Sequence, residues 1–215
     1  NRQRFFFFFF KVNGTSVALK PVGEPYRDLI KAFSDFDELK AYHLDKAARH
    51  APESGQGLNI EGLTRTPDGD LLIGFRNPIP DGKALLIPLQ NPDKVLTEGK
   101  SPRFGTPLFL SLHGRGIRSI EYSTSQKAYF IVAGPYDDNG TFQLYRWSGD
   151  PSEPPESLNI DFQDLHPEAL MIMPGVASRI HILSDDGSKK IAGKHCKGLI
   201  RAQDKSFRSL WIETK

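Results

Sequence analysis

The chain has 215 residues, of which 38% are hydrophobic and 25% are charged, and its net charge at pH 7 is +2. This composition is typical of a soluble globular protein with one large domain or two small ones. Basic and acidic residues are interspersed, so we expect neither nucleic acid nor an anionic membrane as a partner. The longest apolar run, residues 5–10, is too short to cross a bilayer as a helix.

The single cysteine, Cys196, excludes an intramolecular disulfide and any cysteine-based zinc cluster. One cysteine fits a reducing compartment and does not exclude export. The sequence therefore leaves the localisation open.

The first expected strand covers residues 4–12, which include six consecutive phenylalanines. The dipeptide Asn13-Gly14 that follows suits a tight hairpin turn. Six apolar residues in succession cannot alternate between core and water, so we expect both faces of this strand to be packed. An exposed strand of this kind would be an aggregation hazard.

A helical insertion is predicted near residues 25–50, because apolar residues recur there at helical spacing. The residues are Leu29, Ala32, Phe33, Phe36, Leu39 and Leu44. Residues 51–57, rich in proline, serine and glycine, form a flexible connection after it.

The rest of the chain repeats one plan of short apolar strands separated by Pro-Asp-Gly and Asn-Gly turns. The first unit places strands at residues 58–63, 70–76, 83–89 and 107–112, and the second at 117–122, 129–134, 141–147 and 157–162. The third has strands at residues 165–170, 179–184 and 207–212. Each unit reads as an antiparallel meander.

These repeats predict an all-β fold, a β-propeller of four-stranded antiparallel blades in a single domain over residues 1–215. Residues 5–12 match the later strands at 84–89, 142–147 and 207–212, so the chain begins inside a unit. About three and a half blades result, whereas propellers close with about four to eight. We therefore expect further N-terminal blades, from the same chain or from another.

The first strands of the units carry the carboxylates Glu61, Glu121 and Glu168. A glycine follows thirteen residues after each of the first two, which aligns the units. Alternation along a strand then places the three glutamates around one channel, with Asn59 and His166 on the same faces. Ca²⁺ suits such a ring, since it takes six to eight oxygen ligands in flexible geometry.

Two other interpretations of these side chains stay open. Glu61, Glu121 and Glu168 can pair with Arg76, Arg115 or Arg118 and hold the blades together, or the arginines can clamp an anionic ligand through their bidentate fork. Asp185 and Asp186 are additional metal candidates, although Asp-Asp-Gly is also the usual chemistry of a hairpin turn.

Residues 59–63 with 72–78, residues 114–122 and residues 183–187 together resemble a bacterial family catalogued as domain of unknown function 3616. The resemblance covers almost the whole chain. The family is similar to propellers that include the esterase-like phytases and, more distantly, lactonases of the gluconolactonase type. It implies the propeller fold and no assigned activity.

Neither a Gly-x-Ser-x-Gly nucleophile elbow nor a His-Glu-x-x-His zinc motif occurs, which argues against a serine hydrolase and a zinc protease. One hypothesis is a hydrolase of a small phosphate ester or lactone, in which a cation held by the glutamates activates water. The alternative is a non-catalytic binding or scaffold propeller with structural glutamates.

Overall fold

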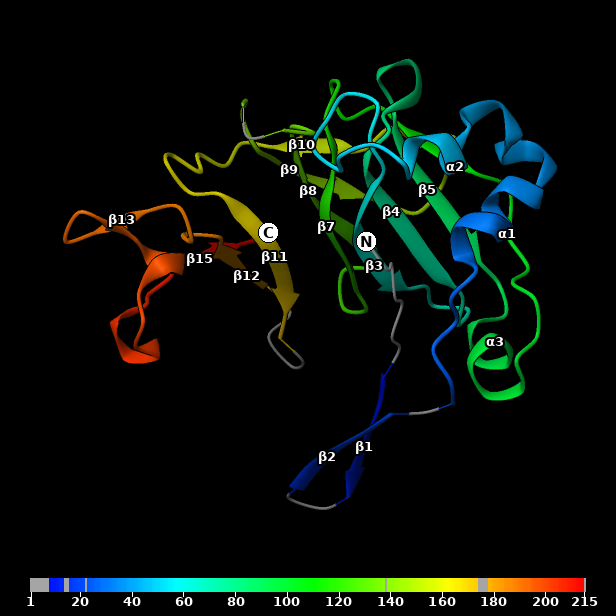
Figure 1. Ribbon diagram of the computed structural model, residues 1–215, viewed down its shortest axis with the longest axis horizontal. Coiled ribbons are helices and arrows are strands. Elements are labelled where there is room, and N and C mark those ends of the chain that lie inside the picture. Colours follow the sequence, from blue (N-terminus) through cyan, green and yellow to red (C-terminus); the bar gives the residue numbers. More distant parts are fainter. Residues whose placement is uncertain (1–7, 14–15, 22, 138, 174–177, 215) are drawn as a thin grey trace.

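The computed structural model describes residues 8–13, 16–21, 23–137, 139–173 and 178–214, with side chains described from residue 23 onward (Figure 1). Most of the regular structure is antiparallel β-sheet, as the repeats predicted. Among these residues, no helix is long and apolar enough to cross a membrane.

An N-terminal hairpin precedes the main sheets. Strand β1 (Phe8–Asn13) pairs with β2 (Ser16–Pro21) and, in the described part of the chain, with no other strand. The hairpin lies apart from the larger sheets in Figure 1. The predicted packing of both strand faces concerns side chains that lie outside the described residues.

The predicted helical insertion is present as three short helices. They are α1 (Leu29–Asp35), a 3-10 helix (Asp37–Tyr42) and α2 (Leu44–Ala47). Their apolar residues Leu29, Phe33, Leu39 and Leu44 are buried in one cluster with Ile73, Phe75, Leu85 and Ile87. The insertion therefore covers one face of the sheet to which those four residues belong.

Three antiparallel sheets follow in chain order, and the first two have four strands each. The first sheet contains β3 (Asn59–Arg65), β4 (Leu71–Asn77), β5 (Ala84–Leu89) and β6 (Leu108–Leu110), with α3 (Pro92–Glu98) between its last two strands. The second contains β7 (Gly116–Ser123), β8 (Ala128–Gly134), β9 (Gln143–Trp147) and β10 (Glu156–Leu158).

The third sheet has three strands among the described residues: β11 (Pro167–Ile172), β12 (Arg179–Ser184) and β15 (Ser209–Glu213). Between β12 and β15 the chain forms the small hairpin β13 (Lys190–Ile191) and β14 (Lys194–His195), then two 3-10 helices, Cys196–Gly198 and Ala202–Asp204. In each sheet the strands are hydrogen-bonded in their sequence order, which confirms the meander plan.

The core lies between successive sheets. One apolar cluster joins Leu72 and Leu86 of the first sheet to Ile120 and Ile131 of the second. Another joins Phe130, Val132 and Leu144 of the second sheet to Leu170, Ile180 and Ile182 of the third. The second sheet is covered on both faces, and accordingly every residue of β8 is buried. Burial on both faces explains why the sequence of β8 is apolar without interruption.

Glycines let the first two sheets approach each other closely. A Cβ atom on Gly62 would lie 2.7 Å from Cγ2 of Ile117, and one on Gly116 would lie 1.9 Å from the carbonyl oxygen of Arg76. Any larger residue at these two positions would push β7 away from β3 and β4. The spacing of the sheets, and of the polar groups between them, therefore depends on these glycines.

Candidate functional site

The first strand of each sheet carries a β-bulge near its beginning. A bulge leaves one residue unpaired in the ladder and re-aims its side chain. The unpaired residues are Glu61 in β3, Arg118 in β7 and Glu168 in β11. Glu61 lies between the cross-strand pairs Ile60–Phe75 and Gly62–Gly74. Arg118 lies between the pairs Ile117–Ala133 and Ser119–Val132. Glu168 lies between the pairs Pro167–Ser184 and Ala169–Leu183.

The bulges correct the alignment of the three units that the sequence suggested. Glu121, which was aligned with Glu61 and Glu168, pairs with Phe130 farther along β7. The position in β7 that corresponds to Glu61 is occupied by Arg118. Two carboxylates and one guanidinium, rather than three carboxylates, therefore occupy the equivalent positions.

Glu61, Arg76, Arg118 and Glu168 form a central charge cluster of alternating sign. Nη1 of Arg76 donates a hydrogen bond to Oε1 of Glu61 at 3.0 Å, and Nε of Arg118 lies 3.1 Å from Oε2 of Glu61. Nη2 of Arg118 also donates to Oε1 of Glu168. Glu61 and Arg76 belong to β3 and β4 of the first sheet, Arg118 to β7 of the second and Glu168 to β11 of the third. The cluster therefore connects all three sheets.

Further hydrogen bonds fix the first-sheet side of the cluster. Arg76 donates from Nε to the carbonyl oxygen of Pro135 and from Nη2 to that of Asp137, each at 3.0 Å. Asn59 donates from Nδ2 to Oε1 of Glu61 at 2.9 Å. The carboxylate of Glu61 thus has three polar neighbours, and Arg76 ties the first sheet to the loop after β8.

Arg118, like Arg76, is a deeply enclosed charge of the cluster. Its side chain is 4% exposed, and within the described residues its Nη1 atom has no hydrogen-bond partner. The guanidinium lies 5.5 Å from the ring centroid of Phe142, in a cation–π contact. A charge removed from water to this extent costs free energy unless it is paired. The stability of this region therefore depends on Glu61 and Glu168.

The pKa of Glu168 is raised above its usual value. Burial is the largest cause; the positive charge of Arg118 opposes the shift, and the negative charge of Glu61 adds to it. The side chain is 35% exposed, whereas that of Glu61 is 20% exposed. Glu168 is thus the carboxylate of the cluster that solvent reaches most easily.

His166 lies beside the cluster, and Arg115 does not join it. The ring of His166 meets that of Phe142 edge-on, with centroids 5.8 Å apart. Arg115 instead donates to the carbonyl oxygen and the hydroxyl of Thr141, at 2.9 and 2.7 Å. It therefore anchors the segment before β9.

The two aspartates proposed as metal ligands make structural contacts. Oδ1 of Asp185 accepts the backbone N–H of Gly187 at 2.7 Å, which is turn chemistry. Asp186 is buried and accepts hydrogen bonds from Nε and Nη2 of Arg208 at 2.9 and 2.7 Å, and from the hydroxyl of Ser184. These bonds, chiefly those from Arg208, lower the pKa of Asp186 to about 2.

Glu121 lies apart from the cluster, in an open groove that Leu63 and Lys127 also line. No hydrogen bond or ion pair to its carboxylate occurs in the described part of the chain. Burial raises its pKa. Of the three aligned glutamates it is the one that arginine does not neutralise.

Among the described residues, the three glutamates expected to surround a Ca²⁺ ion do not come together, because Glu121 lies apart from Glu61 and Glu168. Within the described ranges, no group of three or more His, Cys, Asp or Glu side chains is placed to hold a metal ion. Glu61 and Glu168 each contact Arg118, whose guanidinium takes the place between them that a cation would need.

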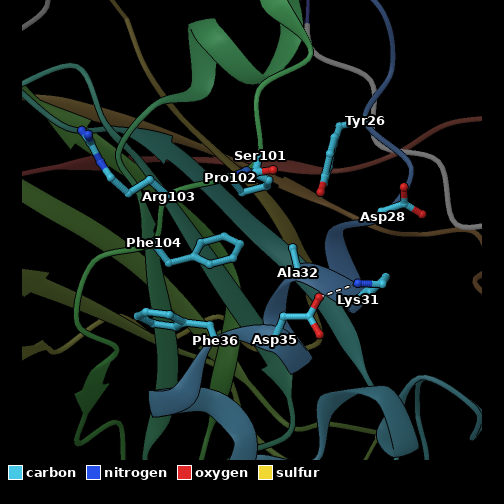
Figure 2. Close-up of a pocket in the computed structure, with 10 residues that line it drawn as sticks. All are labelled: Tyr26, Asp28, Lys31, Ala32, Asp35, Phe36, Ser101, Pro102, Arg103 and Phe104. Atoms are coloured by element: carbon cyan, nitrogen blue, oxygen red, sulfur yellow. Dashed lines mark hydrogen bonds and ion pairs between the residues drawn. The ribbon is translucent and has the colours of Figure 1, made fainter.

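Sequence reasoning missed a pocket of about 530 Å³ beside α1 (Figure 2). In this view Tyr26 lies on one side of it, Phe104 and Phe36 lie on the other, and Pro102 lies between Tyr26 and Phe104, while Lys31 and Asp35 of α1 form an ion pair at 2.5 Å. The rings of Phe36 and Phe104 are 5.7 Å apart. These residues come from the helical insertion and from residues 101–104, and no spacing in the sequence links the two segments.

Comparison with protein families gives one match. The model of the family described as "Protein of unknown function (DUF3616)" matches residues 15–177, about three quarters of the chain. The chain belongs to this family. The match spans the helical insertion, the first two sheets and the beginning of the third, including all four members of the central charge cluster. No curated protein and no solved structure matches the chain.

Proposed function

We propose that this member of the DUF3616 family is a non-catalytic binding or scaffold domain, and that its sheets are blades of a β-propeller. Three observations support the blades: the meander order within each sheet, the face-to-face packing of successive sheets, and the equivalent bulges in β3, β7 and β11. Propellers bury the face of each blade against its neighbour in this manner.

The observation that carries the proposal is the position of Arg118. A guanidinium that is 4% exposed pairs with a carboxylate from the first sheet and another from the third. A metal-dependent hydrolase needs its carboxylates free to bind a cation and to activate water. Here the protein supplies the positive charge itself, so the glutamates fasten the sheets together.

Glu168 is the residue through which a hydrolase would have to work. It is partly exposed, its pKa is raised, and its partner Arg118 contacts the ring of Phe142, which His166 also contacts. Buried carboxyl groups with raised pKa values occur as general acids and also in buried structural sites. Glu168 is therefore the residue that distinguishes the two functions experimentally.

The test is hydrolysis of p-nitrophenyl phosphate, p-nitrophenyl acetate and δ-gluconolactone, each with added Ca²⁺ and with EGTA. We expect no turnover that depends both on Ca²⁺ and on Glu168. The matched variants are Glu168→Gln and, as a control on an exposed helix position, Glu98→Gln. Turnover that EGTA and Glu168→Gln both abolish, with Glu98→Gln unaffected, would overturn the proposal in favour of the hydrolase.

A further inference from the structure

A groove of about 850 Å³ lies beside the ends of β3 and β7 and the turns that follow them. Leu63, Arg65, Glu121, Tyr122 and Lys127 are among the residues that line it. A volume of this size suits a small organic molecule. The groove adjoins β3 and β7, two of the four strands that carry the central charge cluster, and it includes the aligned glutamate that the cluster does not contain, Glu121.

Glu121 gives the groove an unpaired negative charge. The carboxylate is half-buried, and no donor or cation of the described residues contacts it. A partly buried charge without a partner is costly, because desolvation is not offset by a hydrogen bond or an ion pair. A ligand that donated hydrogen bonds and carried positive charge would remove this cost.

Arg65 and Lys127 supply positive charge at the rim of the same groove. Both are exposed, and neither forms an ion pair within the described ranges. Lys127 has a φ angle of +48°, a left-handed conformation that disfavours residues other than glycine. In the hairpin after β3 the positive φ angle belongs to Gly69 instead. A lysine thus occupies a position of unfavourable backbone conformation, and its side chain borders the groove.

The walls between these charges include apolar side chains. Leu63 is 46% exposed, which is unusual for a leucine within a strand of the main sheets, and Leu71 lines the groove with it. An aliphatic group that packed on Leu63 would leave water on binding, which favours association.

We propose that this groove binds a small zwitterion of the amino acid or short peptide class. Its ammonium group pairs with Glu121, its carboxylate with Lys127 and Arg65, and an aliphatic side chain covers Leu63. The inference rests on the proposed function, since it names the ligand of a non-catalytic binding domain. Each charged group of the ligand would thus pair with a side chain that forms no ion pair within the described residues.

The test is calorimetric titration with L-leucyl-L-leucine, its N-acetyl derivative and its C-terminal amide. The free dipeptide should bind with a Kd of about 1 mM or lower. Loss of either terminal charge should weaken binding at least about tenfold, because each removes a charge-assisted contact. Absence of saturable binding of the free dipeptide, or equal binding of the N-acetyl derivative, would overturn the proposal.

Two variants locate the site. Glu121→Gln should weaken dipeptide binding at least about tenfold and leave that of the N-acetyl derivative unchanged, since only the ammonium contact is lost. Lys127→Gln should weaken binding of the dipeptide and leave that of its amide unchanged. Glu98→Gln, on the exposed face of α3, should leave all affinities unchanged.

Equal affinities in Glu121→Gln and the parent protein would contradict the site. Hydrolysis of the substrates named above would instead contradict the proposed function, so the two failures are distinguishable.

Discussion

Replacing Arg118 by methionine removes the guanidinium and leaves an apolar side chain about as long as the aliphatic part of arginine. Removing one partner of a buried ion pair costs about 3–5 kcal/mol, because the remaining charge stays buried without compensation. Two features reduce this cost here: Glu61 keeps its hydrogen bond from Arg76, and the side chain of Glu168 is 35% exposed. We therefore expect a loss of about 2–3 kcal/mol in the free energy of unfolding.

Urea unfolding at pH 7, followed by circular dichroism, measures this loss as a lower midpoint with an unchanged slope. For a domain of this size the melting temperature should fall by roughly 5–10 °C. The matched control is Arg115→Met, which loses exposed hydrogen bonds such as those to Thr141 and should cost less than about 1 kcal/mol. Adding Glu168→Gln to Arg118→Met should recover part of the loss, since one uncompensated carboxylate disappears. A change of less than about 0.5 kcal/mol in Arg118→Met would refute a structural role for the cluster.

The remaining predictions concern the close approach of the sheets and two carboxylates. Gly62→Ala should lower the free energy of unfolding by about 1–3 kcal/mol, because its Cβ would meet Ile117 at 2.7 Å; unchanged stability in urea would contradict the close packing. Asp186→Asn should cost about 2 kcal/mol at pH 7, where the ion pair with Arg208 is intact. Since the pKa of Asp186 is lowered from 3.8 to about 2, this stabilisation is complete above about pH 4 and declines as the pH falls toward 2. A cost that persists at pH 2 would disprove the pairing. Glu121→Gln should raise the urea midpoint at neutral pH, because burial raises the pKa of Glu121 and penalises its charged form. The gain should shrink as the pH falls and Glu121 takes up its proton, and a gain independent of pH would contradict the cause.

Much of the fold could be predicted from the sequence because its signals are local. Turn dipeptides separate short apolar runs, and these runs became the strands of three meanders in the expected order. The helical spacing from Leu29 to Leu44 likewise predicted an insertion, whose apolar side packs on the first sheet. Each of these predictions needs only neighbouring residues and the period of their hydrophobicity.

The register of the strands could not be predicted, since a bulge leaves no mark in composition. Glu61 and Glu121 each precede a glycine by thirteen residues, yet Gly74 pairs with Gly62 whereas Gly134 pairs with Gly116. The equal spacings therefore cover different parts of the two hairpins. One unpaired residue in the ladder changes which side chains are equivalent.

The sequence named arginines as possible partners of the glutamates, but it could not decide which of these charges meet. Arg118 and Glu168 are fifty residues apart, and their contact depends on how the second and third sheets pack. Asp186 and Arg208 belong to segments separated by β13 and β14. A list of acidic and basic residues contains the right members, but only the packing of the sheets determines which of them meet.

The central claim is that Arg118, and not a bound cation, neutralises Glu61 and Glu168. The most direct test is the melting temperature of the protein measured with EGTA and with millimolar Ca²⁺, beside the variant Arg118→Met under the same conditions. The account predicts equal melting temperatures in EGTA and Ca²⁺ for the parent protein, and a lower one for Arg118→Met. A parent protein that Ca²⁺ stabilises and EGTA destabilises, with Glu168→Gln abolishing the difference, would contradict it.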